Sequence, residues 1–199
     1  MPAPDNRPIA INDAEIIAAS RREPNVFALI FDRHYDAISS YLGRRVDRGL
    51  ADELASETFV RAFDGRDAYD AAHLDARPWL YGIATNLVHK HQRAEERRRR
   101  AYSRAVESDK TGGGLDGVDA RVDALALGPA VAAALARLQP ADRDTLLLLA
   151  LTGLDYEGIA IATDVPVGTV RSRLHRARRH MRNDLALHEA KRATERSGT

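Results

Sequence analysis

The sequence predicts an all-α protein made of two small helical domains joined by a flexible linker. Apolar residues in the first half recur at spacings of three and four, from Phe27 through Phe31 and Tyr35 to Leu42, which is the period of one helix face. No segment shows the sustained apolar–polar alternation of a half-buried strand. Three successive glycines at 112–114 interrupt the helical patterns near the middle of the chain, as a flexible linker would.

Each half divides into short helices whose ends carry local signals. Pro78 suits a first helical turn, Asp142 and Asp155 are candidate N-caps, and Gly153 is a stop signal. The patterns predict helices at about 13–22, 27–42, 50–63, 77–93, 129–138, 142–151 and 155–163, and a long helix from 167 onward. The expected division of the chain is a first domain at 1–100, the linker at 101–123, a second domain at 124–187 and a polar tail at 188–199.

Composition favours a cytoplasmic protein without membrane contact. Of the 199 residues, 44% are hydrophobic, which is enough for packed cores, yet no apolar run approaches the ~20 residues that span a membrane. The N-terminus lacks the basic-then-apolar order of a secretory signal, and the absence of cysteine excludes disulfides and thiolate metal sites. We expect no bound cofactor and no metal.

Residues 155–182 have the layout of a helix-turn-helix, whose second helix enters the major groove of DNA. No acidic residue occurs between Val167 and Arg182, whereas an ordinary surface helix carries charges of both signs. The residues expected to pack inward are Val167, Val170, Leu174, Ala177 and Met181. Those expected to donate to base edges or phosphates are Thr169, Arg171, Ser172, Arg173, His175, Arg176, Arg178 and Arg179.

The segments Leu154–Ala160 and Val165–Arg178 closely resemble region 4 of the bacterial extracytoplasmic-function (ECF) sigma factors. The resemblance implies that this domain recognises the promoter −35 element. The chain departs from the family pattern at Gly158, where an acidic residue is usual, and a glycine costs about 1 kcal/mol relative to alanine inside a helix.

The first half is similar to region 2 of the same family in Phe27–Tyr35, Ala51–Phe63 and Arg77–Asn86. The resemblance implies core RNA polymerase and promoter DNA as partners, and an anti-sigma factor as a possible inhibitor. It assigns docking on core polymerase to one helix through Asp52, Glu53, Glu57 and Arg61.

The resemblance assigns contact with the melted −10 element to Asn86, His89, Lys90 and Arg93, and the choice of bases to the loop 64–76. Lys90 replaces a usual acidic residue of the family, and Thr85 stands where arginine is common.

Three alternatives stay open. A stand-alone helix-turn-helix regulator would explain only the second domain. An enzyme is disfavoured because no catalytic constellation appears and because His89 and His91 lack the usual helical metal-pair spacing. A relative that only sequesters a partner would not need two basic faces.

Overall fold

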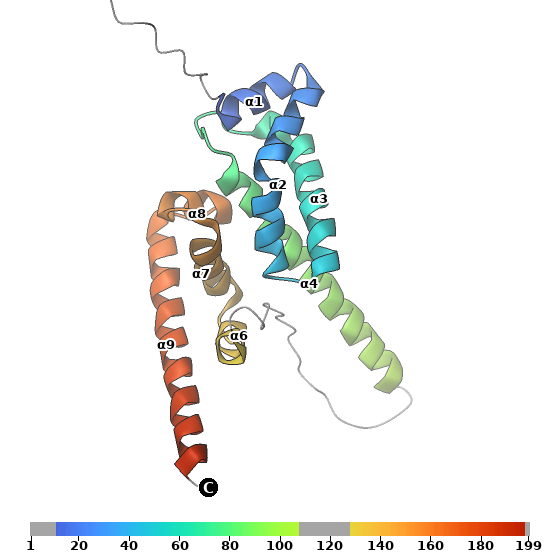
Figure 1. Ribbon diagram of the computed structural model, residues 1–199. Helices are drawn as coiled ribbons and strands as arrows, with labels where there is room; N and C mark the ends of the chain where they lie inside the picture. The colour runs from blue at the N-terminus through green and yellow to red at the C-terminus, as the bar shows by residue number, and fades with distance from the viewer. Residues whose placement is uncertain (1–10, 108–127, 198–199) are drawn as a thin grey trace, which may run out of the picture.

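The structure is a computed structural model that describes residues 11–107 and 128–197. Both described parts consist of helices and connecting turns, and neither contains a strand (Figure 1). The predicted all-α class is therefore confirmed. The glycines at 112–114, on which the linker prediction rests, lie outside the described residues.

The first module comprises α1 Asp13–Ser20, α2 Ala28–Gly43, α3 Arg48–Gly65 and α4 Arg77–Glu107, with short 3-10 turns at Pro24–Phe27 and Arg66–Ala68. Local caps set two of the starts. The Asn12 side chain accepts a hydrogen bond from Glu15 N (2.9 Å), and Glu15 Oε2 accepts one from Asn12 N (3.1 Å). Asp47 Oδ1 accepts from Leu50 N at the start of α3 (3.1 Å). These side chains satisfy amides that the first helical turn leaves unpaired.

The second module comprises α6 Pro129–Ala136, α7 Pro140–Thr152, α8 Tyr156–Thr163 and α9 Val167–Ser197. Asp155 caps α8 as predicted, because its Oδ1 accepts from Gly158 N (2.8 Å). Gly153 ends α7 in the left-handed conformation (φ 68°), as predicted, and Asp164 adopts the same conformation (φ 50°) in the turn before α9.

The predicted cap of α7 is wrong. The helix begins at Pro140, with Gln139 at the N-cap position, so Asp142 lies inside the first turn and is buried. Proline favours this start because its fixed φ suits the first helical position and its missing N–H would be unpaired there anyway.

Two helices extend farther than predicted. α4 continues to Glu107, through the expected end at 93 and the expected domain boundary at 100, and α9 continues to Ser197, through the expected polar tail. Along α4, Arg100 Nε donates to Glu96 Oε1 (2.7 Å) and Arg98 Nη1 to Glu95 Oε1 (2.7 Å). Such pairs at spacings of three and four support a helix without an apolar face.

The two modules share one hydrophobic core. Leu148 of α7, Ile159 of α8 and Leu174 of α9 belong to the same buried cluster as the apolar side chains of α1 to α4. Where α4 meets α8, a Cβ added to Gly82 would lie 2.8 Å from the carbonyl oxygen of Ala162. Figure 1 shows the consequence: α7, α8 and α9 lie on one side of the first module and α3 lies on the opposite side.

Candidate nucleic-acid interface and acidic docking face

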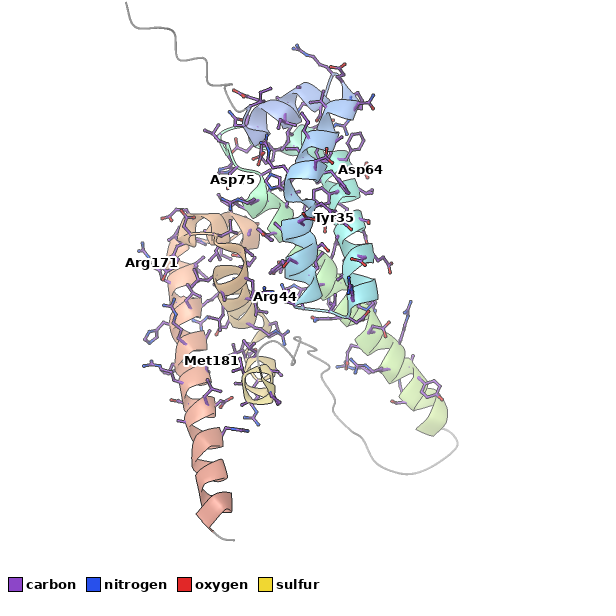
Figure 2. All side chains as sticks on the ribbon, viewed as in Figure 1. Tyr35, Arg44, Asp64, Asp75, Arg171 and Met181 are labelled. Atoms are coloured by element: carbon purple, nitrogen blue, oxygen red, sulfur yellow. The ribbon has the colours of Figure 1, made fainter. Side chains whose placement is uncertain are left out.

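The buried side of α9 matches the prediction at its centre. Val170, Leu174 and Ala177 are fully buried, whereas Val167 and Met181 are half-buried. The expected DNA-binding residues that are exposed are Arg171, Ser172, His175, Arg176, Arg178 and Arg179, and the half-buried ones are Thr169 and Arg173. Figure 2 shows Arg171 on the outer side of α9, directed away from α7. The helix therefore presents a basic face to solvent.

Arg176 differs from its exposed neighbours because it is already paired. Its Nε donates to Asp142 Oδ2 (3.0 Å) and its Nη2 to Asp142 Oδ1 (2.7 Å), which is a two-point contact between α7 and α9. The hydrogen bonds and the charge of Asp142 raise the pKa of the guanidinium. Asp142 engages the Nε and Nη2 of Arg176, which leaves Nη1 for DNA, and the role expected from the sequence stays a prediction. The interpretation of Asp142 as a helix cap concealed this contact.

The predicted −10 residues on α4 fall into two groups. Asn86, Lys90 and Arg93 are exposed. His89 is turned toward the second module, where its Nε2 lies 2.7 Å from Asp144 Oδ2, close but not aligned as a hydrogen bond. The same side of α4 carries Thr85, which is buried. The structure thus leaves one edge of the expected DNA surface open and covers the other edge with α7 and α8.

Five residues form a polar network between the modules. Both Asp144 and Arg45 are buried, and Arg45 Nη2 donates to Asp144 Oδ1. Arg45 Nη1 donates to the hydroxyl of Tyr41, which in turn shares a hydrogen bond with Thr85 Oγ1 (2.8 Å). His89 completes the set through its contact with Asp144. We refer to these residues as the inter-module polar network.

The electrostatics of this network favour an ionised Asp144. Burial by itself would raise the pKa of the carboxyl, but the contacts with His89 and Arg45 outweigh it and hold the pKa below its usual value. Burial raises the pKa of Tyr41, so its phenol stays protonated. Sequence patterns give no signal for this network, because Arg45 and Asp144 are 99 positions apart.

The loop before α4 is held by Asp13. Asp13 Oδ2 accepts from Ala76 N (2.9 Å) and lies 2.8 Å from His34 Nε2, while Oδ1 accepts from Arg33 Nη1 (2.5 Å). Burial would raise the pKa of Asp13, yet these contacts lower it to about 2. At the exposed end of the loop, Leu74 projects into solvent. These contacts therefore fix the end of the loop that leads into α4, the loop that we expect to select the bases of the −10 element.

The acidic residues expected to contact polymerase lie on the outer side of α3. Asp52, Glu53 and Arg61 are exposed and Glu57 is half-buried, whereas the opposite side of the helix packs into the core. Arg61 donates to Glu57 Oε1 through Nε (2.8 Å) and Nη2 (2.7 Å). Because α3 lies on the far side from the second module, this face is accessible in the packed arrangement (Figure 1).

Two further features bear on the site. Among residues 11–107 and 128–197, no group of three or more His, Cys, Asp or Glu side chains is placed to hold a metal ion. No helix in this described part of the chain is both long enough and apolar enough to cross a membrane.

Comparisons with known proteins find a family match in each of the two modules. Residues 30–98 match the family model for Sigma-70 region 2, and residues 129–181 match that for Sigma-70, region 4. The ECF RNA polymerase sigma-E factor of Escherichia coli is 31% identical over 169 residues, covering 81% of this chain and 87% of that protein. The ECF RNA polymerase sigma factor SigE of Mycolicibacterium smegmatis is 34% identical over 167 residues, and the match spans 61% of its length.

A solved structure has the same fold. CnrH, in complex with the cytosolic domain of CnrY, superposes with a TM-score of 0.60 at 21% identity, covering 88% of this chain and 97% of that chain. The two family models cover both modules in order, and the E. coli relative is matched over most of its length. The chain therefore belongs to the ECF sigma factors of the sigma-70 family.

Proposed function

We propose that this chain directs core RNA polymerase to specific promoters and helps to open them for transcription initiation. The observation that carries the proposal is the combination of a basic recognition helix, α9, with a separate exposed acidic face on α3. A stand-alone helix-turn-helix regulator would account for α9 but has no use for the acidic face. The polymerase performs the chemistry, so the chain itself acts without catalysis, in the cytoplasm.

The −35 contacts are assigned to the free residues of α9. Arg171, His175, Arg178 and Arg179 are exposed and have no acidic neighbour on α9 between Val167 and Arg182. Ser172, Thr169 and Arg173 complete the surface. Exposed arginines of this kind donate to guanine edges and to phosphates. Arg176 is held by Asp142 through Nε and Nη2, and its Nη1 remains for a contact with DNA.

The −10 contacts are assigned to α4 and to the loop that precedes it. Asn86, Lys90 and Arg93 are available in the packed arrangement, whereas His89 faces Asp144. A separated DNA strand that contacts His89 must approach from the side that α7 and α8 cover. Full use of this surface therefore requires the two modules to separate, which binding to polymerase would bring about.

Core polymerase is assigned to α3 through Asp52, Glu53, Glu57 and Arg61. This face is open while the modules are packed together, so polymerase can engage the first module before the second is released. An anti-sigma factor is a further expected partner. CnrH, which has the same fold, was solved bound to the cytosolic domain of CnrY, which supports a protein partner for this chain.

The deciding experiment mixes the purified chain with sigma-free core RNA polymerase and fragmented DNA from the source genome, and maps transcript starts. Discrete starts that share a −35 and a −10 sequence are the expected result. The matched control is Glu53→Lys, which reverses one exposed charge on α3 and should reduce transcripts while leaving duplex DNA binding by α9 unchanged. DNA binding without polymerase association or transcripts would establish the stand-alone regulator instead.

A further inference from the structure

A groove of about 710 Å³ lies where the first module meets the start of α7. Its lining includes six arginines and three carboxylates, with Val46, Leu50 and Pro140 as apolar parts of the wall. The arginines are Arg45, Arg93, Arg97, Arg99, Arg100 and Arg143, and the carboxylates are Asp47, Glu95 and Glu96. The volume is within the usual range for a small-molecule site.

Arg143 is the unusual member of this lining. The residue is 6% exposed, yet within residues 11–107 and 128–197 no hydrogen bond or ion pair reaches its guanidinium. Burial lowers the pKa of Arg143, Asp144 raises it, and the charge of Arg45 lowers it again. Because an unpaired buried charge is costly, buried arginines normally have a counter-charge. Within the described residues, the acid whose charge reaches Arg143 is Asp144, and Asp144 is already paired with Arg45.

The carboxylates of the groove cannot supply that counter-charge. Asp47 caps α3, Glu95 pairs with Arg98 (2.7 Å) and Glu96 pairs with Arg100 (2.7 Å). Arg45 is likewise engaged, with Asp144.

Two exposed arginines of α4, Arg93 and Arg97, also line the groove and have no ion pair within the described residues. Together with Arg143 they provide three guanidinium groups, one from the second module and two from the first, for which the described residues supply no ion pair. The N-terminus of α7 adds to the positive potential of the groove through its helix dipole. Pro140 of its first turn lines the groove, and the N-cap residue Gln139 makes no side-chain hydrogen bond to the first amides.

We propose that this groove binds a small anion that carries a diphosphate, with Arg143 as its principal ligand and Arg93 and Arg97 as secondary ligands. Guanidinium groups match phosphate oxygens with two-point geometry. A diphosphate carries about three negative charges near neutral pH, which balances the three unpaired arginines, whereas a single phosphate would leave charge uncompensated. The apolar wall at Val46 and Leu50 offers a surface for an attached group such as a nucleoside. Because the ligands come from both modules, the bound anion stabilises their packed arrangement.

The test measures binding of inorganic pyrophosphate and of ADP to the full chain by calorimetry, in sodium chloride of matched ionic strength. Pyrophosphate should bind saturably, and Arg143→Gln should weaken it at least tenfold, since one charge-assisted contact of this kind changes affinity by about that factor. Arg97→Gln, a substitution at an exposed position, should weaken binding several-fold. Arg22→Gln removes an equal charge from an exposed residue outside the groove and should change affinity less than twofold.

A second readout separates a ligand-binding Arg143 from a merely structural one. Without ligand, Arg143→Gln should melt no lower than the unsubstituted chain, because it removes an unpaired charge beside Arg45. Pyrophosphate at a fixed concentration should raise the melting temperature of the unsubstituted chain more than that of Arg143→Gln. Absence of saturable binding, equal weakening by Arg22→Gln, or a lower melting temperature of unliganded Arg143→Gln would each overturn the proposal. The measurement uses neither polymerase nor promoter DNA, so its failure leaves the sigma-factor proposal standing.

Discussion

Replacing Asp144 by asparagine removes the negative charge on which the inter-module polar network depends. Asp144 and Arg45 are 3% and 5% exposed, so the variant leaves a guanidinium buried without its counter-charge. His89 loses its acidic partner at the same time. Asparagine keeps the shape of the side chain and one acceptor oxygen, so the change tests charge rather than packing. The two modules should separate more often.

The magnitude follows from the burial of the pair. Removing one partner of a buried ion pair costs about 3–5 kcal/mol, and the oxygen that asparagine retains places this variant near the lower end. A change of about 3 kcal/mol shifts the equilibrium between packed and separated modules about 150-fold. When the modules separate, water reaches the Arg45 guanidinium and removes the cost of a buried unpaired charge, whereas each module keeps its own helices. The expected effect is therefore on the arrangement of the modules and not on helix content.

The distance between the modules can be measured directly because the chain contains no cysteine. Cysteines introduced at the exposed positions Ser40 of α2 and Ala133 of α6 accept a donor and an acceptor dye for energy transfer. We expect Asp144→Asn to lower the mean transfer efficiency and to broaden its distribution. Circular dichroism should show unchanged helix content.

Asp142→Asn is the matched control. Asp142 is also a buried acid of α7 that pairs with an arginine, but its partner, Arg176, belongs to the same module. This variant should leave the transfer efficiency unchanged. If Asp144→Asn keeps the packed distance, or if Asp142→Asn opens the modules to the same extent, the charge of Asp144 does not hold the modules together.

Three further predictions follow from the described contacts. Gly82→Ala should open the modules in the same energy-transfer assay, because its Cβ would lie 2.8 Å from the Ala162 carbonyl oxygen, although alanine by itself favours the helix by about 1 kcal/mol. The pKa of Asp13 is about 2 in the folded chain against 3.8 unfolded, so its ionised form should add about 2 kcal/mol to the free energy of unfolding above pH 4, and this contribution is lost as the pH falls toward 2. Urea unfolding at several pH values should show the difference in free energy of unfolding between the unsubstituted chain and Asp13→Asn shrinking over that range. Arg178→Gln should weaken binding to all duplex sequences alike and reduce the salt slope by about 1, as fluorescence anisotropy titrations would show.

Local features of the fold were predictable because their causes lie within a few residues. Asp155 caps α8 through an amide three positions away, and Gly153 ends α7 by its own backbone preference. The buried residues Val170 and Leu174 follow from helix period alone. In each case, the sequence segment contains both the signal and the partner.

The inter-module contacts could not be predicted in the same way. Arg45 lies in the turn after α2, and His89 and Asp144 have the character of ordinary surface residues of amphipathic helices, so only the tertiary packing brings the three together. The same limit applies to Arg176: the absence of acidic residues along α9 indicated a free basic face, but Asp142 approaches from another helix. The charged residues within one helix do not indicate which charged residues a neighbouring helix places against it.

The position of His89 connects the fold to the proposed function. The family resemblance assigns this residue to the melted −10 strand, while the structure turns its Nε2 toward Asp144 and leaves the ring only partly exposed. The exposed residues of α9 and the acidic face of α3 face no such conflict, because both are accessible while the modules are packed. Recognition of −35 duplex and docking on polymerase can therefore precede contact with the melted strand. In the proposed function, polymerase must then supply the free energy of the packed arrangement before α4 is fully available, and both the shared hydrophobic core and the inter-module polar network contribute to that free energy.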